Sequence, residues 1–226
     1  MAYGTLKSGR IPNSAQESHP WRIREIVPDF TLEDVWALPV EGGAEDFPRL
    51  LEMGASINPA RSDSRATRAL WQLRDRLGAW FNLGRIVVPA RQSFGTDSDR
   101  NDYRTQGDLP IPGTSETSLT ERLPDNLRNT AEGQDFGSLP FSPLYRTDDE
   151  AAAEVSNQTV HGVMHLAWVD RGGGRYQGQM AVYVKPRGLL GRGYMELIKP
   201  FRHWIVYPAL MRQFERAWDR RSGAAA

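Results

Sequence analysis

Two histidines four residues apart, His161 and His165, have the type and spacing that could hold a metal ion or move a proton. On a helix such a pair chelates well, but the run TVHGVMHLAWVD alternates apolar and polar residues as a strand does. On a strand the same spacing separates the two Cα atoms by about 13 Å, too far to share one ion. The sequence therefore predicts no metal site, and both histidines remain candidate general acid–base groups.

The next run along the chain adds a tyrosine to this set. YQGQMAVYVKP alternates as well, and the glycine-rich RGGGR before it forms a turn, so residues 159–186 predict a β-hairpin. Pairing Trp168 with Tyr176 places His161 opposite Tyr183. If this face lines a cavity, its titratable groups could polarise or deprotonate a bound carbonyl compound; if it faces solvent, they are ordinary surface residues. The candidate catalytic residues are His161, Tyr183 and His165.

The C-terminal part carries a broad apolar stripe at helical spacing over residues 193–221, which predicts one long helix. Pro200 and Pro208 interrupt it, and each is expected to bend the helix because proline removes a backbone donor. Arg202 adjoins the first bend. It could hold a ligand carboxylate with two hydrogen bonds, or pair with an acidic residue of the middle segment.

Bulky apolar and aromatic side chains gather on the other hairpin face and on this C-terminal stripe. Such residues line pockets for apolar ligands, but they also fill cores, so both alternatives stay open. The candidate ligand-binding residues are Trp36, Met164, Trp168, Met180, Tyr194, Arg202, Trp204, Tyr207 and Met211.

Shorter patterns predict the remaining elements. They are a strand at 21–30, short helices at 31–38 and 46–53, an amphipathic helix at 64–82 and a short strand at 85–89. Residues 93–150 are rich in Gly, Pro, Ser, Thr, Asn and Asp, and they form either a lid over a site or weak strands. The expected organisation is a flexible tail at 1–20, one domain at 21–221 with the acidic, loop-rich segment at 93–150, and a disordered tail at 222–226.

Composition excludes several function classes. The 226 residues contain no cysteine, which rules out disulfides, thiol nucleophiles and cysteine-bound metals. The 28 basic and 28 acidic residues balance, which argues against a uniformly basic nucleic-acid-binding surface. No stretch approaches the roughly 18 apolar residues of a spanning helix, and the N-terminus lacks a signal-peptide core, so a cytoplasmic protein without a membrane span is expected.

The charge is unevenly distributed along the chain. Residues 91–154 carry 6 basic and 13 acidic side chains, whereas residues 155–226 carry 11 basic and 4 acidic side chains. The two parts are expected to attract each other within one domain, or the basic part binds an anionic partner.

The order of elements predicts an α+β fold in which a curved antiparallel sheet packs on a long, kinked C-terminal helix, the helix-grip arrangement. Four stretches resemble a bacterial family, domain of unknown function 2867: SLTERLPDNLR (118–128), PFSPLYRTDDEAAAEVSNQTVHGVMHLAWV (140–169), QMAVYVKPRGLLGRGYM (179–195) and IKPFRHWIVYPALMRQFERAW (198–218). The resemblance covers about residues 20–220. That family is similar to the START-like, polyketide-cyclase-like (SRPBCC) superfamily of helix-grip proteins, which implies a protein that holds a hydrophobic small molecule or lipid.

Three functions are consistent with these observations. The first is binding of a hydrophobic small molecule in a cavity between the sheet and the C-terminal helix, without a cofactor. The second is a cyclase, isomerase or hydrolase of polyketide-like metabolism that uses general acid–base residues on the same scaffold. The third is a protein-interaction module with a filled core. A homodimer is expected if aromatic side chains are exposed on the outer hairpin face.

Overall fold

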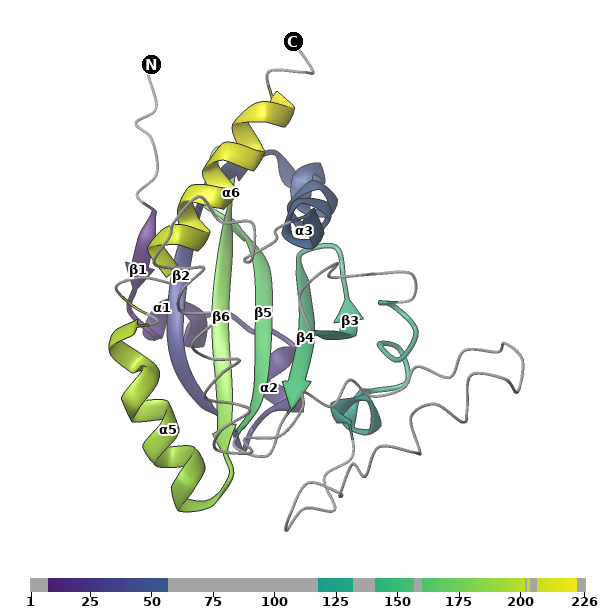
Figure 1. Ribbon diagram of the computed structural model, residues 1–226. Coiled ribbons are helices and arrows are strands. Elements are labelled where there is room, and N and C mark those ends of the chain that lie inside the picture. Colours follow the sequence, from purple (N-terminus) through teal and green to yellow (C-terminus); the bar gives the residue numbers. More distant parts are fainter. Residues whose placement is uncertain are drawn as a thin grey trace, which may run out of the picture.

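The computed structural model describes residues 8–56, 118–131, 141–156, 160–201, 203 and 207–222. Within these residues, six strands form one curved antiparallel sheet in the order β1-β2-β6-β5-β4-β3 (Figure 1). The strands are β1 (Gly9–Ile11), β2 (Thr31–Gly42), β3 (Ser142–Arg146), β4 (Glu150–Ser156), β5 (Val160–Asp170) and β6 (Tyr176–Pro186). The helices are α1 (Ser14–Glu17), α2 (Ile23–Ile26), α3 (Phe47–Ser56), α5 (Gly188–Phe201) and α6 (Tyr207–Ser222), with 3-10 turns η1 (Ala44–Asp46) and η3 (Leu119–Arg122). The predicted α+β class is confirmed.

Both faces of this sheet are covered. Helices α3 and α6 lie across the face nearer to the viewer in Figure 1, where they pack on Leu166 and Met180. We call this face the helix side. The other face carries Val163 and Ala181 and packs against α2 and η3, and we call it the N-terminal side. Because successive strand residues point to opposite faces, each strand contributes to both cores.

The predicted hairpin is confirmed as β5 and β6, but the predicted pairing is two residues out. Trp168 lies opposite Gly178, and Tyr176 lies opposite Asp170. The turn between them is short because Gly172, Gly173 and Gly174 all adopt positive φ, which only glycine does readily. A shift of two residues preserves the side-chain alternation, so the predicted division of the hairpin into two faces holds.

The predictions for residues 21–38 are wrong in both elements. The segment 21–30, predicted as a strand, contains helix α2, whose Ile23 and Ile26 are buried on the N-terminal side. The segment 31–38, predicted as a helix, is part of β2. Ile23, Ile26 and Val27 have the spacing of one helical turn, and this short signal was hidden by the alternation of neighbouring residues.

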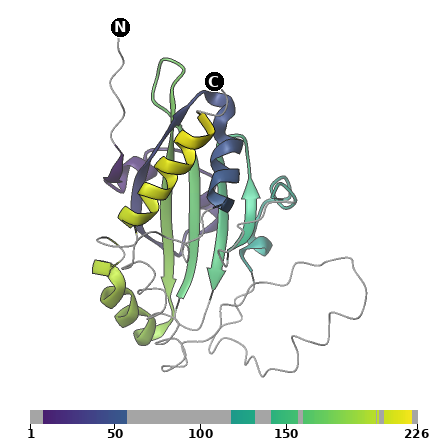
Figure 2. The same cartoon turned by 45° about the horizontal axis from the view of Figure 1, so that its top comes forward.

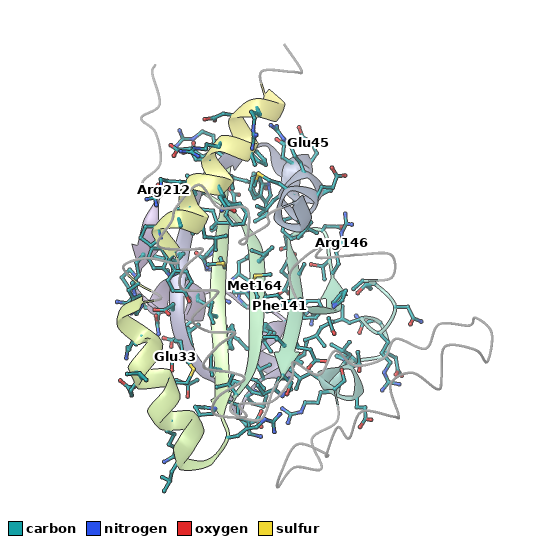
Figure 3. The ribbon with its side chains drawn as sticks, viewed as in Figure 1. Glu33, Glu45, Phe141, Arg146, Met164 and Arg212 are labelled. Carbon is teal, nitrogen blue, oxygen red and sulfur yellow. The ribbon has the colours of Figure 1, made fainter. Side chains whose placement is uncertain are left out.

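Two irregularities in β2 explain why it resembled a helix. An extra residue at Glu33 places Leu32 on the N-terminal side and Asp34 on the helix side, and a second irregularity lies around Pro39 (Figure 3 labels Glu33). Proline has no backbone N–H, so it suits a place where the ladder is interrupted. These insertions break the strict alternation that identifies a strand.

The C-terminal stripe forms two described helices, the 14-residue α5 and the 16-residue α6, which are separate segments in Figure 2. Pro200 lies one residue before the end of α5. Pro208 is the second residue of α6, where no intrahelical bond from its nitrogen is needed, and residues 204–206, where the predicted bend would begin, lie outside the described residues. The single long helix is thus replaced by two shorter ones in the described residues.

Other predictions have mixed outcomes. The helix predicted at 46–53 is confirmed by α3, and β3 is a strand within the segment 93–150. Residues 9–17, expected within a flexible tail, instead form β1 and α1. The helix predicted at 64–82 and the strand predicted at 85–89 lie outside the described residues. In the part of the chain that the structure describes, no helix is long and apolar enough to cross a membrane.

Candidate functional site

Side chains of the helix side form a row that crosses the sheet from β2 to β4. Asp34 of β2 lies opposite Val182 of β6, Val182 lies opposite Met164 of β5, and Met164 lies opposite Ala153 of β4. The neighbouring row consists of Arg10, Trp36, Met180, Leu166 and Ala151, taken from β1 to β4. Each row therefore runs from polar or aromatic side chains at β2 to small alanines at β4.

The polar end of these rows is built around the carboxylate of Asp34, which is fully buried. Its Oδ1 lies 2.5 Å from His203 Nε2 and 3.3 Å from Arg10 Nε. Its Oδ2 accepts a hydrogen bond from the Tyr207 hydroxyl at 3.3 Å. Burial of a carboxylate is costly unless it is hydrogen-bonded, so these contacts keep Asp34 in its place and join β1, β2 and α6.

Aromatic rings surround this carboxylate. The Trp36 ring lies 4.7 Å from the Tyr207 ring and 6.4 Å from the imidazole of His203, measured between centroids. His203 and Trp36 are stacked with an interplanar angle of 27°. We call Asp34, Trp36, His203 and Tyr207 the aromatic–carboxylate cluster. It combines large apolar surfaces with polar atoms at one place.

Next to this cluster the apolar surface is only partly buried. Met164, Val182 and Met211 pack against the helix-side core but keep part of their surface accessible. Met164 lies over the middle of the sheet, away from the end where α3 crosses (Figure 3). Methionine is unbranched and polarizable, and it adapts to contacts of different shapes.

The other end of the helix side is a closed core. Trp168 is 2% exposed, and its indole N–H donates to the Gly43 carbonyl at 2.7 Å. The Trp168 ring lies 6.0 Å from that of Trp218, which in turn has the guanidinium of Arg49 above it at 4.0 Å. This end therefore has the interlocked packing of a protein interior.

The N-terminal side holds a buried polar network centred on His165. Its Nε2 lies 2.8 Å from Glu150 Oε2, and its Nδ1 lies 3.0 Å from Gln16 Nε2. Because an amide nitrogen only donates, Nδ1 accepts and Nε2 carries the proton. Gln16 also donates to the Tyr183 hydroxyl at 3.0 Å and accepts from Gln179 at 2.7 Å. The network ties α1 to the sheet.

Glu150 receives further donors from two other elements. Its Oε2 accepts from the Tyr145 hydroxyl at 2.9 Å, and its Oε1 accepts from the backbone N–H of Arg22 at 2.8 Å. Burial acts to raise the pKa of Glu150, but its hydrogen bonds with His165, Arg22 and Tyr145 outweigh burial and hold the pKa below its usual value. Burial, with the charge of Glu150, raises the pKa of Tyr145 far above its usual value.

A second histidine–glutamate pair repeats this geometry four residues away. His161 Nε2 lies 2.8 Å from Glu154 Oε2, and the Glu154 carboxylate also accepts from the Ser118 hydroxyl and from the Leu119 backbone N–H. The Phe30 ring meets His161 edge-on, with centroids 5.1 Å apart. Both pairs join β4 to β5, and each brings a covering segment onto the N-terminal side.

A family model described as a protein of unknown function (DUF2867) matches residues 26–209. The chain belongs to the DUF2867 family. No curated protein and no solved structure matches the sequence. In this DUF2867 protein the match includes the aromatic–carboxylate cluster and both histidine–glutamate pairs, whereas Arg10 and Gln16 lie before it.

The structure brings the three candidate catalytic residues of the DUF2867 protein onto one face, as predicted. His161, His165 and Tyr183 are 3%, 0% and 6% exposed. His161 lies opposite Lys185 rather than Tyr183, because of the shifted register. Gln16 of α1 contacts His165 and Tyr183 directly, and Glu154, the partner of His161, accepts from the covering segment at Ser118 and Leu119.

Six of the nine candidate ligand-binding residues come together on the helix side. Trp36, Trp168, Met180 and Tyr207 belong to the buried cluster, and Met164 and Met211 lie at its partly exposed margin. Arg202 and Trp204 lie outside the described residues, as does the side chain of Tyr194.

The acidic partners of the histidines were not predicted from the sequence. Glu150 and Glu154 are four residues apart, as are His161 and His165, and this matched spacing on neighbouring strands was the available signal. Asp34 and His203 are separated by 169 residues, and Gln16 lay in a presumed tail. Nothing local marks these three residues as partners.

Proposed function

We propose that this DUF2867 protein binds an apolar small molecule on the helix side of its sheet, between the partly exposed row and α6. The observation that carries the proposal is that accessible apolar side chains of the row lie next to buried polar atoms. Apolar side chains at Met164, Val182 and Met211 keep accessible surface, and they adjoin the polar atoms around Asp34. Sites for small molecules combine a mainly apolar lining with a few polar groups that orient the ligand.

The accessibility of polar groups differs between the two sides of the sheet, and it favours the helix side as the binding site. On the N-terminal side, the candidate residues His161, His165 and Tyr183 are engaged by Glu154, Glu150 and Gln16, whose side chains are themselves buried. On the helix side, His203 keeps 17% of its side chain exposed and Arg10 keeps 52%. Among the described residues, no covering element would have to be displaced for a ligand to reach polar atoms here. The START-like superfamily, to which the DUF2867 family is similar, commonly binds such ligands between sheet and helix.

Titration with an apolar fluorescent dye tests the proposal. Met164→Lys should weaken dye binding by at least about tenfold, because a charged group would stand in the middle of the apolar row. Leu197→Lys is the matched control, since Leu197 is an apolar residue of α5 that is 67% exposed. It should leave binding unchanged. Dye binding that is equally strong in both variants would refute the proposed site.

Two further measurements distinguish loss of the binding site from misfolding of a variant and from an unsuitable dye. Met211→Gln, a milder change on α6, should also weaken binding, and circular dichroism should show that both variants keep the fold. Native mass spectrometry of the protein purified from its own host should detect a bound apolar molecule. The absence of any bound molecule together with no dye uptake would overturn the proposal.

A second candidate function is acid–base catalysis on the bound molecule, favoured by the contact between Asp34 Oδ1 and His203 Nε2. A buried carboxylate bonded to one nitrogen of an imidazole orients the ring, as the carboxylate does in general-base catalysis. This moves the enzymatic hypothesis from His161, His165 and Tyr183 to His203. Once a substrate is known, His203→Asn should abolish turnover and leave binding of the apolar dye intact.

A further inference from the structure

The indole of Trp36 is buried without a hydrogen-bond partner for its N–H. Trp36 is 7% exposed, and its Nε1 has no partner among the described residues. The indoles of Trp168 and Trp218, on the same side of the sheet, donate to the carbonyls of Gly43 and Glu41 at 2.7 and 3.1 Å. A buried donor without an acceptor destabilises the folded state. Native structures therefore contain few such donors, and each of them calls for a specific explanation.

The neighbours of Trp36 limit which group could accept a hydrogen bond from its N–H. Arg10 is its Cα partner on β1 and extends to Asp34, and the Tyr207 ring packs on the indole. The oxygens of Asp34 are fully buried and engaged by Arg10, His203 and Tyr207. At Trp36 the group without a partner among the described residues is therefore a donor, the indole N–H, and the half-exposed guanidinium of Arg10 beside it carries only further donors.

The charges of Arg10 and Asp34 limit which chemical group of a ligand could accept this hydrogen bond. Arg10 and Asp34 carry opposite charges 3.3 Å apart and neutralise each other. A ligand carboxylate would add an uncompensated negative charge beside Asp34, and an amine would bring a further donor to a place that needs an acceptor. A neutral carbonyl oxygen satisfies the donors and adds no charge.

We infer that the molecule bound on the helix side is an apolar carbonyl compound, such as a ketone, an ester or an amide, whose oxygen accepts a hydrogen bond from Trp36 Nε1. This inference rests on the proposed function and specifies its ligand class. The carbonyl oxygen lies at the β2 end of the row, and the apolar body extends along Val182 and Met164.

A pair of dyes that differ only in the carbonyl group tests the inference. One is a dimethylaminonaphthalene that carries a propionyl group, and the other is the same naphthalene without it. Trp36→Phe keeps an aromatic ring and removes the N–H. It should weaken binding of the carbonyl dye by roughly three- to tenfold relative to the carbonyl-free dye, the effect of one hydrogen bond. The infrared stretch of the bound carbonyl should move to higher frequency in this variant.

Trp21→Phe is the matched control. Trp21 also has a buried indole nitrogen without a partner among the described residues, but it lies on the N-terminal side. Its replacement should change the binding of neither dye. Equal losses for both dyes in Trp36→Phe, or no loss for either, would overturn the inference and leave the proposed function standing. Tighter binding of the corresponding carboxylate dye would also overturn it. If neither dye binds to the unmodified protein, the proposed function fails as well.

Discussion

Glu150 makes the strongest set of contacts on the N-terminal side, and its removal provides a quantitative test of the network. The carboxylate is 3% exposed and accepts from His165 at 2.8 Å, from Arg22 N at 2.8 Å and from Tyr145 at 2.9 Å. Glu150→Ala leaves three donors in three different elements without an acceptor. A hydrogen bond to a charged group contributes about 1.5–3 kcal/mol, but contacts within one network are not additive. We expect the free energy of unfolding to fall by about 4 kcal/mol.

Urea unfolding at pH 7, followed by tryptophan fluorescence and circular dichroism, measures this loss. Glu25→Ala, at an exposed position of α2, is the control and should change the stability by less than about 0.5 kcal/mol. Hydrogen exchange gives a local readout, because the Arg22 amide should lose protection when its acceptor is removed. A loss smaller than about 1 kcal/mol, with the Arg22 amide still protected, would show that the network does not hold the covering segment.

The pH dependence of the same comparison has a definite sign. The folded protein holds the pKa of Glu150 below its usual value of 4.5, so folding favours the ionised form. The resulting stabilisation is fully present above the unfolded pKa and is lost as the pH falls through the folded pKa. Glu150→Gln cannot ionise, so its deficit relative to the unmodified protein should shrink as the pH is lowered from 7 to 3. A deficit that stays constant or grows over this range would refute the assignment.

Two further pairs of substitutions test the helix side. Trp36→Phe should cost at least about 1 kcal/mol less stability than Trp168→Phe, because only the indole of Trp168 loses a hydrogen bond; equal costs in thermal unfolding would contradict this. Gly178→Ala should destabilise by about 1–3 kcal/mol, since the added Cβ would lie 2.6 Å from a methyl group of Val40. Gly193→Ala on α5, whose added Cβ would meet no described atom within 4 Å beyond its own helix backbone and chain neighbours, should instead stabilise by about 0.5–1 kcal/mol, and urea unfolding distinguishes the two.

The parts of the fold that could be predicted are those whose pattern is regular over many residues. The strands β5 and β6 are each 11 residues long, so their alternation was visible and their two faces were assigned correctly. Their pairing depended on how tightly three consecutive glycines close the turn, which alternation does not reveal. Strand β2 failed because its insertions at Glu33 and Pro39 break the alternation, and its apolar residues then matched a helical spacing.

The candidate site was only half predictable, for a different reason. Side chains such as Met164 and Met180 could be assigned to one face because their strand neighbours fix their direction. Contacts across the chain carry no such signal. The link between Asp34 and His203 joins a bulged strand to a residue 169 positions later, and no local pattern predicts that contact. The amino-acid types of these two residues were visible, but their proximity was not.

The two sides of the sheet use histidine–carboxylate contacts for different purposes, and accessibility distinguishes them. His165 has partners at both ring nitrogens, and its acidic partner Glu150 meets two further donors, so the network has little capacity for a ligand. A buried network whose members bond to one another fixes a unique arrangement. On the helix side the buried carboxylate of Asp34 contacts a partly exposed histidine, and an indole donor nearby lacks an acceptor among the described residues. An unmet donor beside an accessible apolar row is the arrangement that a bound molecule would complete, and this is why function is assigned to the helix side.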